Sequence, residues 1–236
     1  MERALKTDDK EVLVLDLNLS LANAIRRSSF EIKTLAIKEV EFFKNDSVLN
    51  DEILAHRIGM IPLKNERLKE GEVIEIPLKY EAKKEGEEIL SQQLGKDLVA
   101  INDIPLVKLN KGQKVEFIAR ASLGNAKEHS RHLPGLIYYY TYKKINLNND
   151  AKKNFSLVEV YPKIFTLENN EVIVKNEWAC DFEEDDINFK NVEIKSTDKI
   201  VFVIESFGMM STSDILRESV KVLDKNLNEL KKELSK

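Results

Sequence analysis

The chain has 236 residues, of which 42% are hydrophobic and 33% charged, a composition typical of a globular protein with enough apolar material for a sizeable core. Its 41 acidic and 37 basic residues give a net charge of −4, which argues against a protein that binds nucleic acid through a large basic surface. The sequence shows neither a signal peptide nor an apolar run of the ~20 residues that span a membrane. Its single cysteine, Cys180, excludes an intramolecular disulfide. We therefore expect a soluble cytoplasmic protein.

The first predicted elements form a strand–helix–strand unit. Residues 11–17 are rich in β-forming side chains and predict a strand, and residues 34–43 predict a second one. Between them, Asn18 or Ser20 provides a side-chain oxygen that can cap a helix running to about residue 30.

A second, short helix is predicted over residues 51–59. Its acidic residues lie in the first turn and its basic residues in the last turn, which complements the helix dipole. Gly59 is expected to end this helix in a left-handed conformation, and Pro62 prevents its continuation.

The middle of the chain, from about residue 72 to 176, is expected to be mainly β. Gly, Asn and Lys clusters separate the candidate strands, which are 73–80, 114–122, 136–145, 155–160 and 171–175. The acidic residues 181–198 are expected to form a surface connection. Residues 199–207 are the clearest strand in the sequence.

The C-terminal segment predicts a long amphipathic helix. Ser211 is expected to cap it, with Asp214 three residues later in a capping-box-like arrangement. Apolar residues then recur every third or fourth position, and we call them the heptad seam: Leu216, Val220, Leu223, Leu227, Leu230 and Leu234. The pattern alone leaves open whether the seam packs on the chain's own sheet or against a helix of a partner.

No arrangement of residues predicts a catalytic site or a bound cofactor. The histidines His56, His129 and His132 lack the further ligands that complete a tetrahedral metal site, and a metal-dependent enzyme using them is a minor alternative. The acidic residues beside Cys180 disfavour a reactive thiolate. The run Glu183–Asp186 is more typical of a solvated surface than of a metal site.

Two segments resemble motifs of the α-like RNA polymerase subunits, a family that includes the archaeal D subunits, the third-largest subunit of eukaryotic polymerase II and bacterial α. Residues 19–27 (LSLANAIRR) are similar to the first-helix motif of that family. Residues 47–63 (SVLNDEILAHRIGMIPL) resemble the archaeal and eukaryotic form of the next motif, and this match is long and specific.

Further segments resemble the same family in the same order. Residues 103–113 are similar to its insert segment, residues 124–135 to its loop with a Lys-Glu-His sequence, and residues 203–208 to its C-terminal return. The resemblance thus covers about residues 12–234. Bacterial α is a poorer match, because its C-terminal DNA-binding domain has no counterpart here.

The resemblance implies an α+β fold with a discontinuous α/β dimerisation domain, residues 1–46 and 199–236, and an inserted, mainly β domain, residues 47–198. It also implies a non-catalytic assembly subunit of DNA-directed RNA polymerase, a nucleotidyltransferase complex. The expected partners are a smaller α-like subunit (archaeal subunit L), the small subunits N and P, and the large catalytic subunits. Contact with DNA is expected only through the complex.

In this family the first and last helices form the interface between the two α-like subunits. The resemblance therefore implies a partner interface that contains Asn23, Arg26, Arg27, Leu216, Val220, Leu223, Leu227 and Leu230. Arg26 and Arg27 match positions that face a large subunit, although packing within their own domain remains the alternative.

The chain departs from some relatives in its cysteines. Tyr161 stands where cluster-bearing archaeal members have a cysteine, and one thiol cannot hold an iron–sulfur cluster, so none is predicted. Residues 64–100 also lack the cysteines of the eukaryotic zinc loop.

The alternative to a polymerase assembly subunit is a free-standing transcription regulator that binds nucleic acid by itself.

Overall fold

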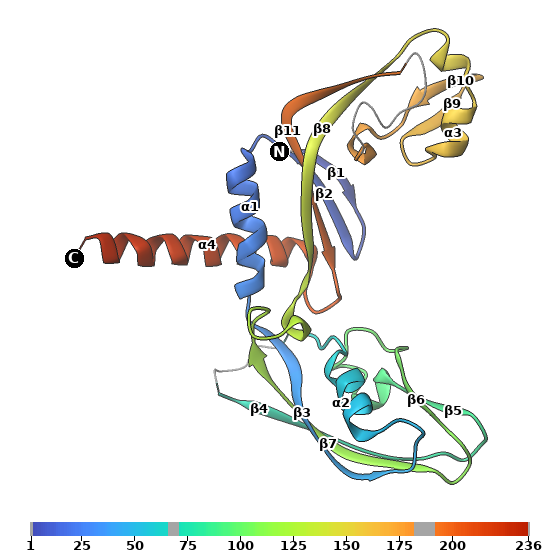
Figure 1. Cartoon of the computed structure of the whole chain (residues 1–236), viewed down its shortest axis with the longest axis vertical. Helices are drawn as coiled ribbons and strands as arrows, with labels where there is room; N and C mark the ends of the chain where they lie inside the picture. The colour runs from blue at the N-terminus through green and yellow to red at the C-terminus, as the bar shows by residue number, and fades with distance from the viewer. Residues whose placement is uncertain (1, 66–70, 182–191, 236) are drawn as a thin grey trace. The chain divides into compact units, whose positions relative to one another are not determined.

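The computed structural model describes residues 2–65, 71–181 and 192–235 (Figure 1). Contacts within the chain divide it into two compact units, Met1–Ala24 with Ile137–Ile204, and Ile25–Leu136 with Glu205–Lys236. Helices and mostly antiparallel sheets occur together, which confirms the predicted mixed α and β class. The finer prediction of a dimerisation domain interrupted by an insert remains a prediction.

The first unit is built on a four-stranded sheet. Its strands, in spatial order, are β1 (Glu2–Lys6), β2 (Lys10–Leu15), β11 (Val192–Ser206) and β8 (Gly135–Leu147). The β1–β2 hairpin is antiparallel. Buried Val12, Val201 and Val203 form the core of one cluster, and half-buried aromatic side chains pack against them.

A second cluster of the same unit contains α3 (Ser156–Val160), β9 (Phe165–Glu168) and β10 (Glu171–Val174). The strands β9 and β10 pair antiparallel, and the positive φ angles of Asn169 and Asn170, 49° and 64°, suit the type I′ turn that joins them. Fully buried Leu157, Phe165 and Cys180 lie in its core.

Two predictions for this unit are wrong. Residues 155–160 form the helix α3 and not a strand, because Leu157 and Tyr161 share one helical face on the apolar cluster and the Tyr161 amide donates to the Leu157 carbonyl (2.9 Å). Residues 192–198, expected in a surface connection, belong to β11. The acidic run Glu183–Asp186 lies outside the described residues.

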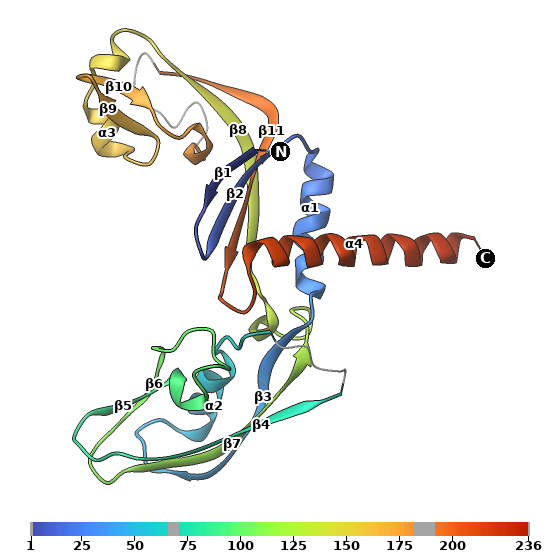
Figure 2. The same ribbon diagram turned by 180° about the vertical axis from the view of Figure 1, so that it is seen from behind.

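The second unit contains a three-stranded antiparallel sheet in the order β3 (Thr34–Asn45), β7 (Lys114–Gly124), β4 (Val73–Glu81). Buried and half-exposed residues alternate along β7, as a strand with one face in the core requires. Figure 2 shows α2 (Asp51–Gly59) beside this sheet, with the small sheet of β5 (Glu87–Leu90) and β6 (Pro105–Leu109). Leu54 and Ile58 of α2 are buried in the common core.

Two further helices begin where the sequence predicts. The helix α1 (Leu19–Ser28) is capped by Asn18, whose Oδ1 accepts from the amide of Leu21 (2.8 Å). The helix α4 (Thr212–Leu234) is capped by Ser211, whose Oγ accepts from the Asp214 amide (3.1 Å) and donates to its carboxylate (2.7 Å). Both caps are confirmed. Among the helices of the described part, none has the length and apolar character needed to cross a membrane.

The predicted left-handed stop at Gly59 is wrong. Gly59 is the last residue of α2, and Met60 follows it with φ −91° and ψ 0°. The glycine instead makes room for Arg131, since a Cβ at Gly59 would lie 3.1 Å from Arg131 Nη1. That nitrogen donates to the Ile37 carbonyl of β3 (2.6 Å), so the missing side chain gives an arginine the space to pack against α2 while it bonds to the sheet.

Candidate partner interface

The helix α4 buries one face and exposes the heptad seam. Thr212, Ile215 and Ser219 are buried, and they lie on a face beside the seam and not on it. The exposed fractions of seam residues are 46% for Val220, 56% for Leu227, 55% for Leu230 and 79% for Leu234, while Leu216 and Leu223 are half-buried. The seam therefore runs along the part of α4 that the second unit does not cover.

The last turns of α4 are the most open part of this helix. Every residue from Leu227 to Ser235 is exposed. An isolated helical segment of this length is marginally stable in water, and amphipathic helices gain most of their stability by packing an apolar face. Ion pairs such as Lys221–Glu218 (2.6 Å) and Lys225–Glu229 (3.7 Å) occupy the polar side and contribute only a few tenths of a kcal/mol each, roughly.

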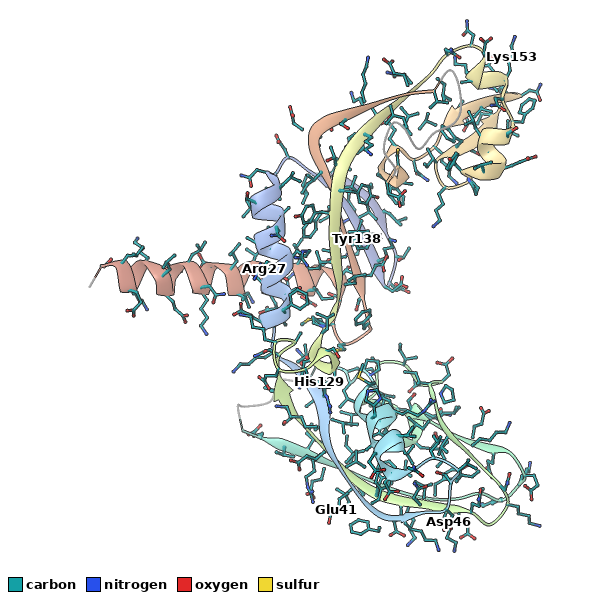
Figure 3. All side chains as sticks on the ribbon, in the orientation of Figure 1. Arg27, Glu41, Asp46, His129, Tyr138 and Lys153 are labelled. Carbon is teal, nitrogen blue, oxygen red and sulfur yellow. The ribbon has the colours of Figure 1, made fainter. Side chains whose placement is uncertain are left out.

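The predicted interface residues of α1 have different surroundings. Asn23 and Arg26 are half-buried, and Arg27 is exposed on the helix (Figure 3). Arg26 and Arg27 line a hollow of about 350 Å³. Its other lining residues are Ser28, Phe30, Glu31, Ala126 and Lys127. The structure thus brings the two arginines together but does not place Asn23 with them.

Glu31 connects the end of α1 to two other segments of the second unit. It lies in the short 3-10 helix η1 (Ser29–Glu31), accepts from Lys127 Nζ (2.6 Å), and accepts from the Asn226 side chain of α4 (3.3 Å to each oxygen). The pKa of Glu31 lies below its ordinary value, chiefly because Lys127 donates to the carboxylate. The described lining of the hollow thus contains three basic side chains and one acidic one, so its formal charge is positive.

Two histidines, His129 and His132, help to hold in place the segment 124–135, which we call the motif loop. His132, in η3 (Ser130–His132), is buried, and its Nδ1 donates to the Thr34 carbonyl (2.9 Å), which makes Nδ1 the protonated nitrogen of the neutral ring. Burial lowers the pKa of His132 below its ordinary value. His129, labelled in Figure 3, accepts from the Arg131 amide through Nδ1 (3.1 Å), and His56 is exposed on α2.

No metal or nucleophile site emerges from these side chains. Within the described ranges, no three His, Cys, Asp or Glu side chains are grouped so that they could hold a metal ion. Cys180 is fully buried in an apolar cluster, where a substrate cannot reach it.

Sequence reasoning missed the contacts that fix this region. Neither the packing of Arg131 against Gly59 nor the junction of Glu31, Lys127 and Asn226 follows from periodicity, because the partners are far apart in the chain. The only sequence signal is that Arg131 and Lys127 belong to a segment resembling a family motif.

An exposed apolar stripe on a capped helix, beside a positively charged hollow, defines the class of proteins that assemble with another chain. Comparison with known proteins agrees: the family described as the RNA polymerase Rpb3/Rpb11 dimerisation domain matches residues 11–227. The DNA-directed RNA polymerase subunit Rpo3 of Pyrococcus horikoshii is 33% identical over 96% of both chains. The Rpo3 subunit of Thermococcus kodakarensis is also 33% identical, over 96% of this chain and 95% of the relative.

The chain belongs to the α-like subunits of DNA-directed RNA polymerase, in the archaeal branch named Rpo3. The family predicted from the motifs is confirmed, and with it the role of a polymerase assembly subunit in transcription. The alternative of a free-standing nucleic-acid-binding regulator receives no support.

Proposed function

We propose that the chain forms a heterodimer with a smaller α-like subunit, subunit L in archaea, through the heptad seam, and that this pair then carries the large catalytic subunits. The observation that supports this most directly is the exposure of Val220, Leu227, Leu230 and Leu234 along one stripe of α4. A stripe of this width fits one partner helix packed lengthwise better than a broad protein core.

The finer assignments form part of the same proposal. Residues 1–46 and 199–236 act together as the dimerisation domain, and residues 47–198 are the insert. Asn23 joins the seam residues in the interface with the smaller subunit. Arg26 and Arg27 contact a large subunit, which is supported by the outward position of Arg27 and the shared hollow. The small subunits N and P bind elsewhere on the chain.

The test is co-expression with the smaller α-like subunit of the same organism, followed by size-exclusion chromatography with light scattering. We expect one species with the mass of a one-to-one heterodimer. If the two chains elute separately at micromolar concentrations, the proposed pairing is wrong, because an α-like pair that nucleates assembly must persist without the large subunits.

A further inference from the structure

A hollow of about 760 Å³ lies within the first unit, apart from the seam and the arginine hollow. Leu5, Lys10, Tyr138 and Tyr140 line one side of it, and the segments 160–164 and 175–181 supply the remaining lining residues. Ligand pockets in proteins have volumes of roughly 300–1,000 Å³. The hollow is therefore large enough for a short peptide segment or a small organic ligand.

Aromatic side chains cover much of the surface of this hollow. Tyr138 and Tyr140 project from the same face of β8, with ring centroids 6.5 Å apart and planes inclined by 22°. The Tyr140 hydroxyl donates to the Trp178 carbonyl (2.6 Å), which fixes that ring against the opposite wall. All three side chains are only half-buried. Tyrosine and tryptophan are enriched at binding hot spots because they bury a large area at a small cost in side-chain entropy.

The charged residues around the hollow are mostly positive. Among the described lining residues, Lys10, Lys163 and Lys175 are basic and Asp181 is acidic. Lys163 and Lys175 are exposed, as a cationic rim requires. The whole chain has a net charge of −4, so this local excess of lysine differs from the average surface and favours an anionic ligand.

The details favour a peptide over a nucleotide or a nucleic acid. Lys10 Nζ lies 5.9 Å from the centroid of the Tyr138 ring and within 3.3 Å of its hydroxyl, so this lysine is engaged with the tyrosine. Phosphate sites typically use arginine forks or helix N-termini, whereas the described lining has no arginine. Single lysines spaced around an apolar floor suit carboxylates that flank a large apolar side chain.

We propose that this hollow is a docking site for a short acidic segment of another protein, which inserts one large apolar side chain against Tyr138, Tyr140 and Trp178 and pairs its carboxylates with Lys163 and Lys175. It goes beyond the proposed pairing through α4, because its residues belong to a different unit from the seam. An assembly subunit would thereby gain a second attachment point for a partner protein.

Trp178 is the only tryptophan of the chain, so its fluorescence reports on the hollow alone. The probe is a synthetic octapeptide with one central phenylalanine flanked by aspartates and glutamates, titrated into the full chain at low salt up to about 1 mM, the concentration at which weak docking becomes detectable. We expect a saturable change in Trp178 emission. A peptide with lysines in place of the acids should cause none.

Matched charge reversals locate the binding. The double variant Lys163→Glu and Lys175→Glu should raise the Kd by about tenfold or more, because two favourable charge contacts become repulsive. The control Lys144→Glu and Lys153→Glu makes the same change in net charge at exposed lysines of the same unit that do not line the hollow, and it should change the Kd by less than about threefold.

Three results would overturn the docking site. These are no saturable change in emission, an equal effect of the two double variants, or tighter binding of a single-stranded octanucleotide than of the acidic peptide. Placing aspartate at Leu227 and Leu230 should leave the fluorescence titration unchanged, so the pairing through α4 and the docking site can fail independently.

Discussion

Replacing Leu227 and Leu230 with aspartate tests whether the heptad seam is the heterodimer interface. The two leucines expose 56% and 55% of their surface, so a partner helix can bury about half of each side chain. Full burial of a leucine stabilises by roughly 1.5–3 kcal/mol, which gives about 2 kcal/mol for the two exposed halves together. That energy corresponds to about a 30-fold change in Kd, since each 1.4 kcal/mol is a factor of ten.

Aspartate adds a further penalty because its charge must leave water without a partner. An unpaired buried charge costs several kcal/mol, so the double variant should weaken pairing by at least about 100-fold. The assay is isothermal titration of the smaller α-like subunit into each variant. Circular dichroism of the free chain should stay close to that of the parent, since both leucines lie on the exposed part of α4.

The control is Lys232→Asp, which gives the same change in net charge on the same helix. Lys232 lies five residues after Leu227, about 140° around the helix axis from it, and it is exposed. We expect this variant to pair within about threefold of the parent. If the double variant also pairs within threefold, the seam is not the interface and the argument from its exposure is wrong.

Three further predictions concern the elements that hold the candidate interface. Ser211→Ala removes the oxygen that accepts from the Asp214 amide, so thermal unfolding followed by circular dichroism should show a loss of about 1 kcal/mol, whereas Ser211→Asp should be close to neutral. Gly124→Ala places a Cβ 2.5 Å from Nε2 of His132 and should destabilise by about 1–3 kcal/mol in urea; an unchanged midpoint would show that the buried ring has room to move. Because burial lowers the pKa of His132, the unfolded chain binds more protons below pH 6.5, and the stability contributed by the neutral ring is lost as the pH falls through that region. His132→Asn should therefore reduce the stability difference between pH 7.5 and 5.5, and an identical difference in both proteins would contradict the assignment of this histidine.

The sequence predicts the helices better than the strands because helix signals are local. The range 51–59 agrees with α2, and the caps Asn18 and Ser211 mark the starts of α1 and α4, since a cap and its amide lie only a few residues apart. The short strands β1, β5, β6 and β9 are missing from the prediction, because four or five residues give little periodicity to separate them from loops, although the equally short β10 is predicted as 171–175. The run 155–160 was assigned to a strand for the same reason.

In the sequence, the candidate interface is visible only as apolar residues that recur at every third or fourth position. The spacing of the leucines predicts an apolar seam, but it leaves open whether the chain covers that seam with its own residues. The buried face of α4 contains Thr212 and Ser219, and Ser219 Oγ satisfies itself by donating to the Ile215 carbonyl (2.7 Å). Hydropathy would not select these positions as buried, so the exposure of the leucines follows only from the packed structure.

The motif loop explains why residues that match a family need not belong to an active site. Lys127 attaches the loop to η1, His132 attaches it to Thr34, and Arg131 reaches over Gly59 to β3. Each contact joins segments separated by tens of residues, so one loop fixes the start of β3, the end of α2 and the end of α1 together. Lys127, Arg131 and His132 thus make contacts within the second unit, whereas Arg27 is exposed at the end of α1. A loop that fixes these segments while Arg27 stays outward fits the proposed assembly through this surface, because the arginine is held in place before a partner arrives.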